Sequence, residues 1–186
     1  ELVSNGACES FSGWNTASNS DCLSIAGGYE GNAIMISNTD SSRNPYAAQS
    51  LTGIVGGTEY VIRGYFKGSA VSGGGPGIKL EMYESQGGST NENTTNLGNS
   101  GVWKYFEYKV ITPAATTRIS LLLRLYGSGT AYFDNISVKR TGAIDKKMKL
   151  VPETIFYYTE NTIGKVTVEK LGDIPAGAKI YLYIKD

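Results

Sequence analysis

Four segments of the chain alternate apolar and polar residues with a period of two: Tyr60–Lys67, Ile78–Tyr83, Phe106–Val110 and Ile119–Tyr126. A period of two places alternate side chains on opposite faces of a β-sheet, whereas an amphipathic helix needs a period of about 3.6. Capped stretches with helical spacing are almost missing from the sequence. The chain is therefore predicted to be all-β, and its 186 residues suffice for one well-filled sandwich and a small appendage.

The same alternation assigns the two faces of each segment. The residues expected in the core are Tyr60, Ile62, Phe66, Ile78, Leu80, Met82, Phe106, Tyr108, Val110, Ile119, Leu121, Leu123 and Leu125. The residues expected to face outward are Val61, Arg63, Tyr65, Lys67, Lys79, Glu81, Tyr83, Leu122, Arg124 and Tyr126. Surface loops are expected over Gly68–Gly77 and Ser85–Val102, because Gly, Ser, Asn and Thr dominate both segments.

Composition narrows the range of functions. The 17 basic and 17 acidic residues cancel, so long-range attraction to nucleic acid or to an anionic membrane is not expected. The sequence contains no histidine, which removes the commonest general base and disfavours an enzyme. No apolar run approaches the roughly 18 residues of a membrane span, so membrane insertion is not expected. The 13 Tyr and 24 Gly are typical of an extracellular β-protein that binds rather than reacts.

Cys8 and Cys22 leave two alternatives open. They form a disulfide that staples the N-terminal segment to the next strand or loop, or Cys8 is a small buried apolar residue. Further along, a shift to charged residues around Thr141 to Lys149 predicts a boundary. Residues 1–142 are expected to form the sandwich, and residues 143–186 a linker with a three-stranded appendage or the start of a neighbouring domain. The strands expected there are Thr154–Thr159, Lys165–Leu171 and Lys179–Lys185.

Several short motifs follow one another in the order of a known family. They are Asn5-Gly6-x-x-Glu9 followed by Trp14, then Gly27–Ile34, Gly57-Thr58-x-Tyr60, Trp103 at the start of a strand, and Phe133–Val138. Residues 2–140 thereby resemble the carbohydrate-binding modules of families four, nine, sixteen and twenty-two. The resemblance implies a jelly-roll sandwich of two antiparallel sheets, with the two ends of the domain lying together. One departure is Cys8, where the family usually has a large apolar residue.

The resemblance also implies a structural calcium ion. Glu9, Glu30 and Asp134 stand at the matching positions, and the backbone carbonyl of Asn32 is the expected fourth donor. Calcium prefers six to eight hard oxygen ligands, and carboxylates gathered from distant segments would repel one another without a cation. The alternative interpretation is that Glu9 and Glu30 are solvated loop acids.

Carbohydrate recognition needs a flat apolar surface for the C–H face of a sugar ring and planar polar groups for its hydroxyls. The outward faces of three predicted strands supply six such residues, which are expected to line one groove: Arg63, Tyr65, Glu81, Tyr83, Arg124 and Tyr126. Trp14, Tyr46, Gln49 and Trp103 are expected at strand edges or loops, where such modules often keep their ligand platforms. Each residue has a structural alternative: Trp14 and Trp103 as packing residues, Tyr46 as a loop anchor, and Tyr65 and Tyr83 as residues buried under the C-terminal strands.

The function implied by the resemblance is non-catalytic polysaccharide binding that targets a secreted bacterial glycan-degrading enzyme to a β-glucan, mannan or xylan. The expected partners are that polysaccharide and a catalytic module of the parent protein, and the expected location is extracellular. A structural or adhesive domain of a surface or phage-tail protein is the alternative. A glycan-active enzyme comes third, with Glu81 and either Glu107 or Asp134 as its paired carboxylates.

Overall fold

The computed structural model describes residues 1–17, 20–84, 89–141, 148–152 and 166–170. The chain divides into two compact units, Glu1–Thr141 and Gly142–Asp186. The elements of the first unit are a short 3-10 helix (Ser20–Cys22) and strands β1 (Leu23–Gly27), β2 (Asn32–Asn38), β3 (Tyr46–Leu51), β4 (Glu59–Glu84), β5 (Ser89–Asn96), β6 (Ser100–Ile111) and β7 (Thr116–Arg140). Strands β8 (Met148–Pro152) and β9 (Val166–Lys170) form an antiparallel pair in the second unit.

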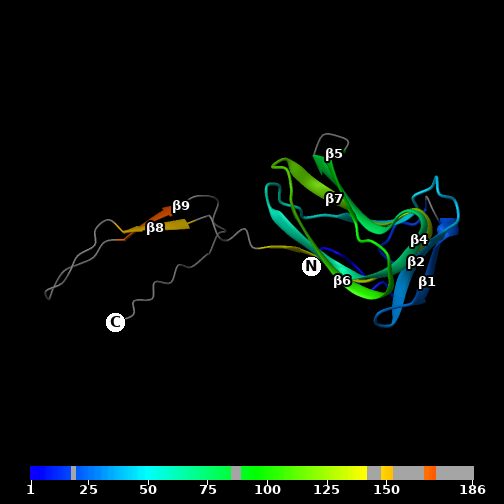
Figure 1. The fold of residues 1–186 in the computed structure, drawn as a ribbon. Coiled ribbons are helices and arrows are strands. Elements are labelled where there is room, and N and C mark those ends of the chain that lie inside the picture. The colour runs from blue at the N-terminus through cyan, green and yellow to red at the C-terminus, as the bar shows by residue number, and fades with distance from the viewer. Residues whose placement is uncertain (18–19, 85–88, 142–147, 153–165, 171–186) are drawn as a thin grey trace. The chain divides into compact units, whose positions relative to one another are not determined.

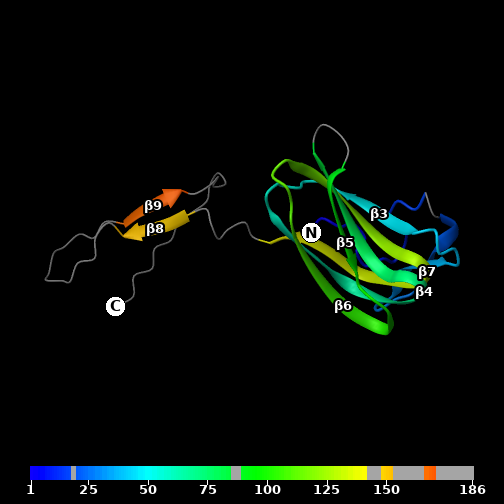
Figure 2. The same ribbon diagram turned by 45° about the horizontal axis from the view of Figure 1, so that its top comes forward.

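The first unit is a β-sandwich whose two layers share the long strands β4 and β7 (Figures 1 and 2). Layer one contains β1, β2, the second half of β7, the first half of β4, and β6 at its edge. Layer two contains β3, the first half of β7, the second half of β4, and β5. All of these strand pairs are antiparallel, which confirms the predicted all-β sandwich.

Glycines allow β4 and β7 to pass from one layer to the other. Gly73 and Gly127 have φ angles of 90° and 89°, which residues with a side chain rarely adopt. A Cβ atom on Gly127 would collide with the backbone oxygen of Ser72 on the facing strand. The loop predicted over Gly68–Gly77 is therefore wrong, because these residues bend β4 without ending it. The loop prediction over Ser85–Val102 is also wrong for β5 and for the start of β6, while residues 85–88 lie outside the described part of the chain.

The core lies between the two layers and contains the residues that the alternation predicts. Every expected core residue is buried except Tyr108, which is half-buried and packs against the core. Two residues expected to face outward, Val61 and Leu122, are only 3% exposed. Val61 lies between Lys109 and Lys139 in the strand register, and long lysine side chains can cover apolar surface.

The N-terminal segment lies along the end of β7. The amide of Leu2 donates to the carbonyl of Val138 over 3.0 Å, and the amide of Ile136 donates to the carbonyl of Gly6 over 2.7 Å. The two ends of the first unit therefore lie together, as expected. Both cysteines are free and buried, and burial raises the pKa of the Cys8 thiol to about 12. The structure thus follows the second alternative, in which Cys8 is a small core residue.

The second unit is described only through its two strands. Strand β9 confirms the strand expected over Lys165–Leu171. Strand β8 begins at Met148, near the end of the Thr141–Lys149 segment in which a boundary was expected. The strands expected over Thr154–Thr159 and Lys179–Lys185 lie outside the described residues. Among the residues that the structure describes, no helix is long and apolar enough to cross a membrane.

Candidate functional site

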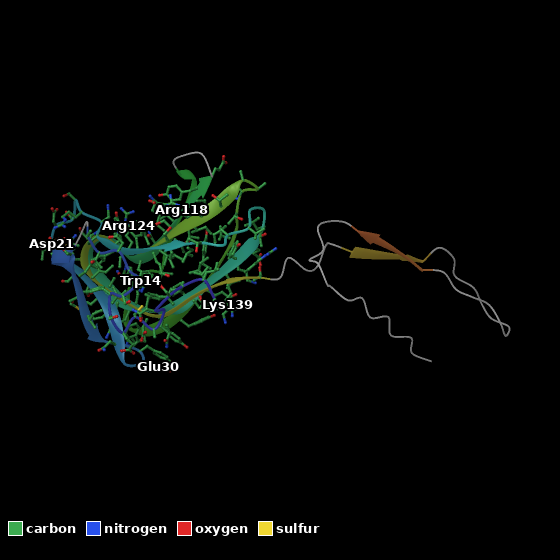
Figure 3. The ribbon with its side chains drawn as sticks, turned by 180° about the vertical axis from the view of Figure 1, so that it is seen from behind. Trp14, Asp21, Glu30, Arg118, Arg124 and Lys139 are labelled. Carbon is green, nitrogen blue, oxygen red and sulfur yellow. The ribbon has the colours of Figure 1, made fainter. Side chains whose placement is uncertain are left out.

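Two of the predicted ligand residues are buried. Trp14 is 5% exposed, and its indole N–H donates to the carbonyl of Asn5 over 3.2 Å. Figure 3 shows Trp14 between the two layers. Gln49 is 6% exposed, and its amide pairs with the backbone N–H and carbonyl of Ser4. Both predictions of an exposed platform are wrong, because one side chain fills the core and the other anchors the N-terminal segment.

The other predicted ligand residues separate onto the outer faces of the two layers. On layer two, residues from β3, β4 and β7 form a surface that we call the arginine face: Tyr46, Lys79, Glu81, Tyr83, Arg124 and Tyr126. On layer one, residues from β4, β6, β7 and the turn before β2 form the tyrosine face: Tyr29, Tyr65, Lys67, Trp103, Tyr105 and Tyr132. The sequence prediction had placed Tyr65 and Glu81 in one groove. The structure places them on different layers, because β4 changes layer between them.

Arg124 occupies the centre of the arginine face. In the register it stands between Tyr46 on β3 and Gly77 on β4. Its guanidinium carbon lies 5.0 Å from the ring centroid of Tyr126 and 5.8 Å from that of Tyr46, within the range of cation–π attraction. A Cβ atom on Gly77 would lie 2.5 Å from the Tyr126 ring, so the glycine makes room for this ring against β4.

Two polar atoms at this centre are buried without a hydrogen-bond partner among the described residues: the Nε of Arg124 and the hydroxyl of Tyr126. A buried polar atom without a partner carries a desolvation cost of about 1–3 kcal/mol. Most such atoms in folded proteins are paired, and unpaired ones often mark a place where a water or ligand belongs. Both atoms lie beneath the surface of the arginine face, so a water or a ligand hydroxyl pairs with them only after the side chains shift.

Glu81 supplies the acceptor beside this centre. Its carboxylate accepts from the Nζ of Lys79 over 2.9 Å and from the hydroxyl of Tyr83 over 2.8 Å. Burial acts to raise the pKa of Glu81, but the hydrogen bonds from Lys79 and Tyr83 and the charges of Lys79 and Arg124 outweigh it and lower that pKa. Glu81 is thus a carboxylate at neutral pH. The guanidinium of Arg118 lies 4.0 Å from the Tyr83 ring and, as Figure 3 shows, on the same side of the sandwich as Arg124.

The tyrosine face is a continuous run of ring contacts. Tyr29 stacks on Tyr65 with centroids 3.8 Å apart and planes 9° apart, and Tyr65 meets Tyr105 edge-on at 5.6 Å. Trp103 meets Tyr29 and Tyr132 edge-on, each at 6.3 Å. Rings in such arrangements attract one another beyond the area that they bury. The five rings therefore hold one another in fixed orientations.

Charged side chains border the same rings. The Nζ of Lys67 lies 4.5 Å from the Tyr132 centroid and 5.1 Å from the Trp103 centroid. The Nε of Arg63 donates to the carboxylate of Glu107 over 2.9 Å, and the hydroxyl of Tyr105 donates to the same oxygen over 3.1 Å. The hydrogen bond from Tyr105 and the charge of Arg63 lower the pKa of Glu107.

The predicted calcium ligands gather around the turn before β2. Asp134 is fully buried and accepts from the amides of Tyr29, Glu30 and Asn135 at 2.8, 2.9 and 2.6 Å. Burial raises the pKa of Asp134, and these N–H donors act in the opposite direction. Glu9 accepts from the amide of Asn32, and Glu30 from the side-chain amide of Asn135.

The donor chemistry of this turn fits calcium, because hard carboxylate oxygens come from three distant segments. Within the described residues, however, no three acidic, Cys or His side chains converge on one point. Each of the three carboxylates accepts N–H donors of the turn or its surroundings. The calcium site is therefore still a prediction.

The carboxylates predicted to act together in an enzyme, Glu81 with Glu107 or Asp134, lie on different layers of the sandwich. Glu81 lies on layer two, whereas Glu107 and Asp134 lie on layer one. Glu107 is engaged by Arg63 and Tyr105, and Asp134 is buried beneath the turn that contains Tyr29. The three acids thus have separate structural partners.

Sequence reasoning missed part of the tyrosine face. Tyr105 stands two residues after Trp103 and two before Glu107, so extending the period-two pattern of β6 would have placed all three on one face. The same argument links Tyr132 to the outward side of β7. Tyr29 gave no such signal, because a turn rather than a strand brings its ring onto Tyr65.

Comparison with known proteins rests on structure alone. No sequence family matches the chain, and no curated protein matches it. Among solved structures, a family 16 carbohydrate-binding module matches with a TM-score of 0.58 and 18% identity, over 75% of this chain and 99% of that one. The first unit has the fold of a carbohydrate-binding module. The resemblance noted in the sequence is thereby confirmed at the level of the fold.

Two larger proteins contain the same fold. One is the xylanase 10B of Clostridium thermocellum, whose family 22 module and catalytic module were solved with xylohexaose; its TM-score is 0.58 and its identity 20% over 76% of this chain. The other is the enzymatically active domain of tailspike protein 4 of bacteriophage CBA120, with a TM-score of 0.59 and 13% identity over 75% of this chain. The chain spans 29% of the xylanase structure and 21% of the tailspike structure.

Proposed function

We propose that the first unit is a non-catalytic module that binds a neutral polysaccharide through the arginine face. The observation that carries the proposal is the centre of that face, where Arg124 lies against two tyrosine rings and the polar atoms of Arg124 and Tyr126 have no partner among the described residues. A sugar presents a flat C–H face to aromatic rings and hydroxyls to planar polar groups, and this surface offers both.

The binding mechanism follows from these groups. A sugar ring placed against Tyr46 or Tyr126 buries its C–H face, while its hydroxyls accept from Arg124 and donate to Glu81. The ion pair of Lys79 and Glu81 holds that carboxylate in place before the ligand arrives, which lowers the entropy cost of binding. Because the face runs across three strands, an extended chain of the β-glucan, mannan or xylan type suits it better than a single sugar.

The biological role that we propose is targeting. A module that holds an insoluble polymer raises the local concentration of substrate for any catalytic module on the same polypeptide. The family 22 module of the xylanase structure stands beside such a catalytic module, which supports this role by analogy. We infer a secreted bacterial enzyme as the parent and an extracellular location.

Affinity electrophoresis through gels that contain soluble β-glucan, glucomannan or xylan tests the proposal. The chain is expected to be retarded in at least one gel. Tyr46→Ala and Arg124→Ala should each weaken that retardation about tenfold or more, because each removes a ring or a charged hydrogen-bond donor. Val55→Ala, an exposed change in the loop between β3 and β4, serves as the control.

Unchanged retardation of both variants would contradict the arginine face as the site. Failure of the wild-type chain to bind any glycan would contradict polysaccharide binding. In that case, oligomerisation of the full chain that depends on residues 143–186 would favour the structural or adhesive alternative. Release of reducing sugars from a polymer would contradict the non-catalytic role.

We further propose a structural calcium ion at the turn before β2, held by Glu9, Glu30, Asp134 and the carbonyl of Asn32. A bound cation would neutralise carboxylates that otherwise depend on N–H donors. Thermal unfolding in calcium and in EDTA tests this proposal: the chelator should lower Tm, and Glu9→Gln should reduce the difference. An identical Tm in both solutions would contradict the site.

A further inference from the structure

We propose that the tyrosine face is a second polysaccharide-binding surface, so that one unit holds two glycan chains on opposite sides. The proposal goes beyond the arginine face, and either surface can fail its test while the other stands. It rests on the exposure of the rings, the satisfied charges around them, and the rigidity of the turn that contains Tyr29.

The rings present open surface in fixed positions. Tyr29 and Tyr105 are 44% and 52% exposed, although Tyr29 contacts two other rings and Tyr105 contacts one. One face of Tyr29 is covered by Tyr65 at 3.8 Å, so the opposite face of the same ring is the one left for a ligand. A platform that is already stacked loses little side-chain freedom when a sugar ring settles on it.

The turn that supplies Tyr29 is anchored to the sheet. The buried carboxylate of Asp134 accepts from the backbone amides of both Tyr29 and Glu30. Asp134 also stands opposite Tyr65 in the strand register, so the support of the turn and the ring beneath Tyr29 belong to adjacent strands. A Cβ atom on Gly28 would collide with the backbone carbonyl of Asn32 and approach Asp134, so only glycine fits this turn.

The charges of the face favour an uncharged ligand. Lys67 lies over the rings of Trp103 and Tyr132, and Arg63 is paired with Glu107. Both cations are therefore engaged within the face and require no counter-charge from a ligand. The Arg63 and Glu107 side chains are still 49% and 33% exposed, so each can accept or donate one more hydrogen bond to a sugar hydroxyl.

The same composition disfavours a protein partner as the occupant. The centres of protein interfaces are depleted of Lys and Glu. Here Lys67 lies among the rings, and Lys109 approaches the Glu107 carboxylate at 3.8 Å. Mixed rings and paired charges suit the alternating C–H and hydroxyl surface of a sugar chain.

The two surfaces point away from each other because they are the outer faces of opposite layers. Figure 3 shows Arg118 and Arg124 on one side of the sandwich and Glu30, next to Tyr29, on the other. A short oligosaccharide therefore cannot contact both surfaces at once. A unit that holds one long chain on each side would cross-link the two chains. On an insoluble polymer, two linked binding events would retain the protein more strongly than either surface alone.

The test uses the full chain, two double variants and their combination. Tyr46→Ala with Arg124→Ala removes the arginine face, and Tyr29→Ala with Tyr105→Ala removes the tyrosine face. Val102→Ala, an exposed apolar change on β6, is the control for loss of surface hydrophobicity. Circular dichroism and thermal unfolding verify that each variant is folded.

Gel retardation on soluble β-glucan, glucomannan and xylan is the first readout. The arginine-face double variant should keep a measurable retardation that is reduced by more than tenfold, the tyrosine-face double variant should keep one that is reduced several-fold, and the fourfold variant should lose it. Light scattering of a long soluble polysaccharide is the second readout. The wild-type chain and Val102→Ala should raise scattering with a maximum at an intermediate protein ratio, and neither double variant should.

Retardation and cross-linking by the Tyr29→Ala, Tyr105→Ala variant at wild-type levels would overturn the proposal and leave the arginine face in place. Complete loss of binding in the arginine-face variant would overturn it as well. A wild-type dimer in sedimentation that is lost only in the tyrosine-face variant, with unchanged sugar binding, would identify a protein interface instead. Binding that survives loss of the arginine face and disappears with Tyr29 and Tyr105 would support the second surface and contradict the first.

Discussion

The arginine face and the tyrosine face share strands β4 and β7, and they differ in how far their polar groups are already paired. On the arginine face, Arg124 and Tyr126 retain buried polar atoms without partners among the described residues. On the tyrosine face, the rings contact one another and Arg63 is paired with Glu107. Both faces are rich in tyrosine, so aromatic content alone does not distinguish them. Unfilled hydrogen-bonding capacity and exposed ring area are the two properties that separate the faces.

The largest effect is expected on stability, from the loss of a core side chain between the two layers. Trp14→Ala should lower the free energy of unfolding by about 3–5 kcal/mol, because the ring is buried between the layers. The affinity of the folded fraction for polysaccharide should be unchanged. Denaturant unfolding and affinity electrophoresis measure the two quantities, with Trp14→Phe as the milder control. A loss of affinity without a loss of stability would place Trp14 in the binding surface after all.

A change at the bend should separate the two faces. Gly127→Ala forces a side chain onto a residue with a φ of 89° and toward the backbone of Ser72. The expected destabilisation is about 1–3 kcal/mol. Because Gly127 follows Tyr126, sugar binding by the arginine face should weaken more than binding by the tyrosine face. Gly53→Ala is a matched control, since Gly53 also has a positive φ but has no atom within 4 Å of a Cβ. Equal losses in both variants would show that only backbone strain matters.

Arg124→Lys tests whether charge alone serves the arginine face. Lysine keeps the positive charge but loses the planar group that stacks on tyrosine and donates in a fixed fork. We expect retardation in the polysaccharide gel to weaken about tenfold, close to the effect of Arg124→Ala. Binding by the tyrosine face should be unaffected. Wild-type affinity in Arg124→Lys would show that a point charge is sufficient.

The smallest effect is expected from a change in pH, and it should alter sugar binding by the arginine face only. The pKa of Glu81 is lowered from its ordinary value of 4.5, so its carboxylate form is favoured by the fold. Any stability and affinity that depend on this form are therefore present above pH 4.5 and lost as the pH falls through the lowered pKa. Gel retardation measured from neutral to acidic pH should decline only in the acidic range. Glu81→Gln should remove that step; a step that persists in Glu81→Gln would assign it to another group.

Much of the fold was predictable because the alternation of apolar and polar residues directly indicates a strand with one buried face. The faces of Tyr60–Lys67 and Ile119–Tyr126 follow from it, with Val61 and Leu122 as the exceptions. The path of the strands was not predictable, because Gly68–Gly77 has the composition of a loop. Its glycines instead supply the positive φ angles that let β4 bend while it stays paired to β7.

The candidate site was predictable residue by residue only in part. Glu81, Tyr83 and Arg124 lie on one face as the alternation implied, and Tyr46 joins them from β3, whereas Trp14 and Gln49 are buried. A tryptophan in a polar loop carries no sequence signal that separates a platform from a core residue. The division of the outward residues between two layers was hidden as well, because it depends on where the long strands cross.

The pairing of the N-terminal segment with the end of β7 has a consequence for how such a unit can be connected to other proteins. Leu2 and Val138 are joined by a 3.0 Å hydrogen bond, so the chain enters and leaves the sandwich at one place. A host protein that received this unit within a surface loop would need to separate the two loop ends by only about the spacing of neighbouring strands. The unit can thus be carried as an insertion in the middle of another fold as readily as at the end of a chain.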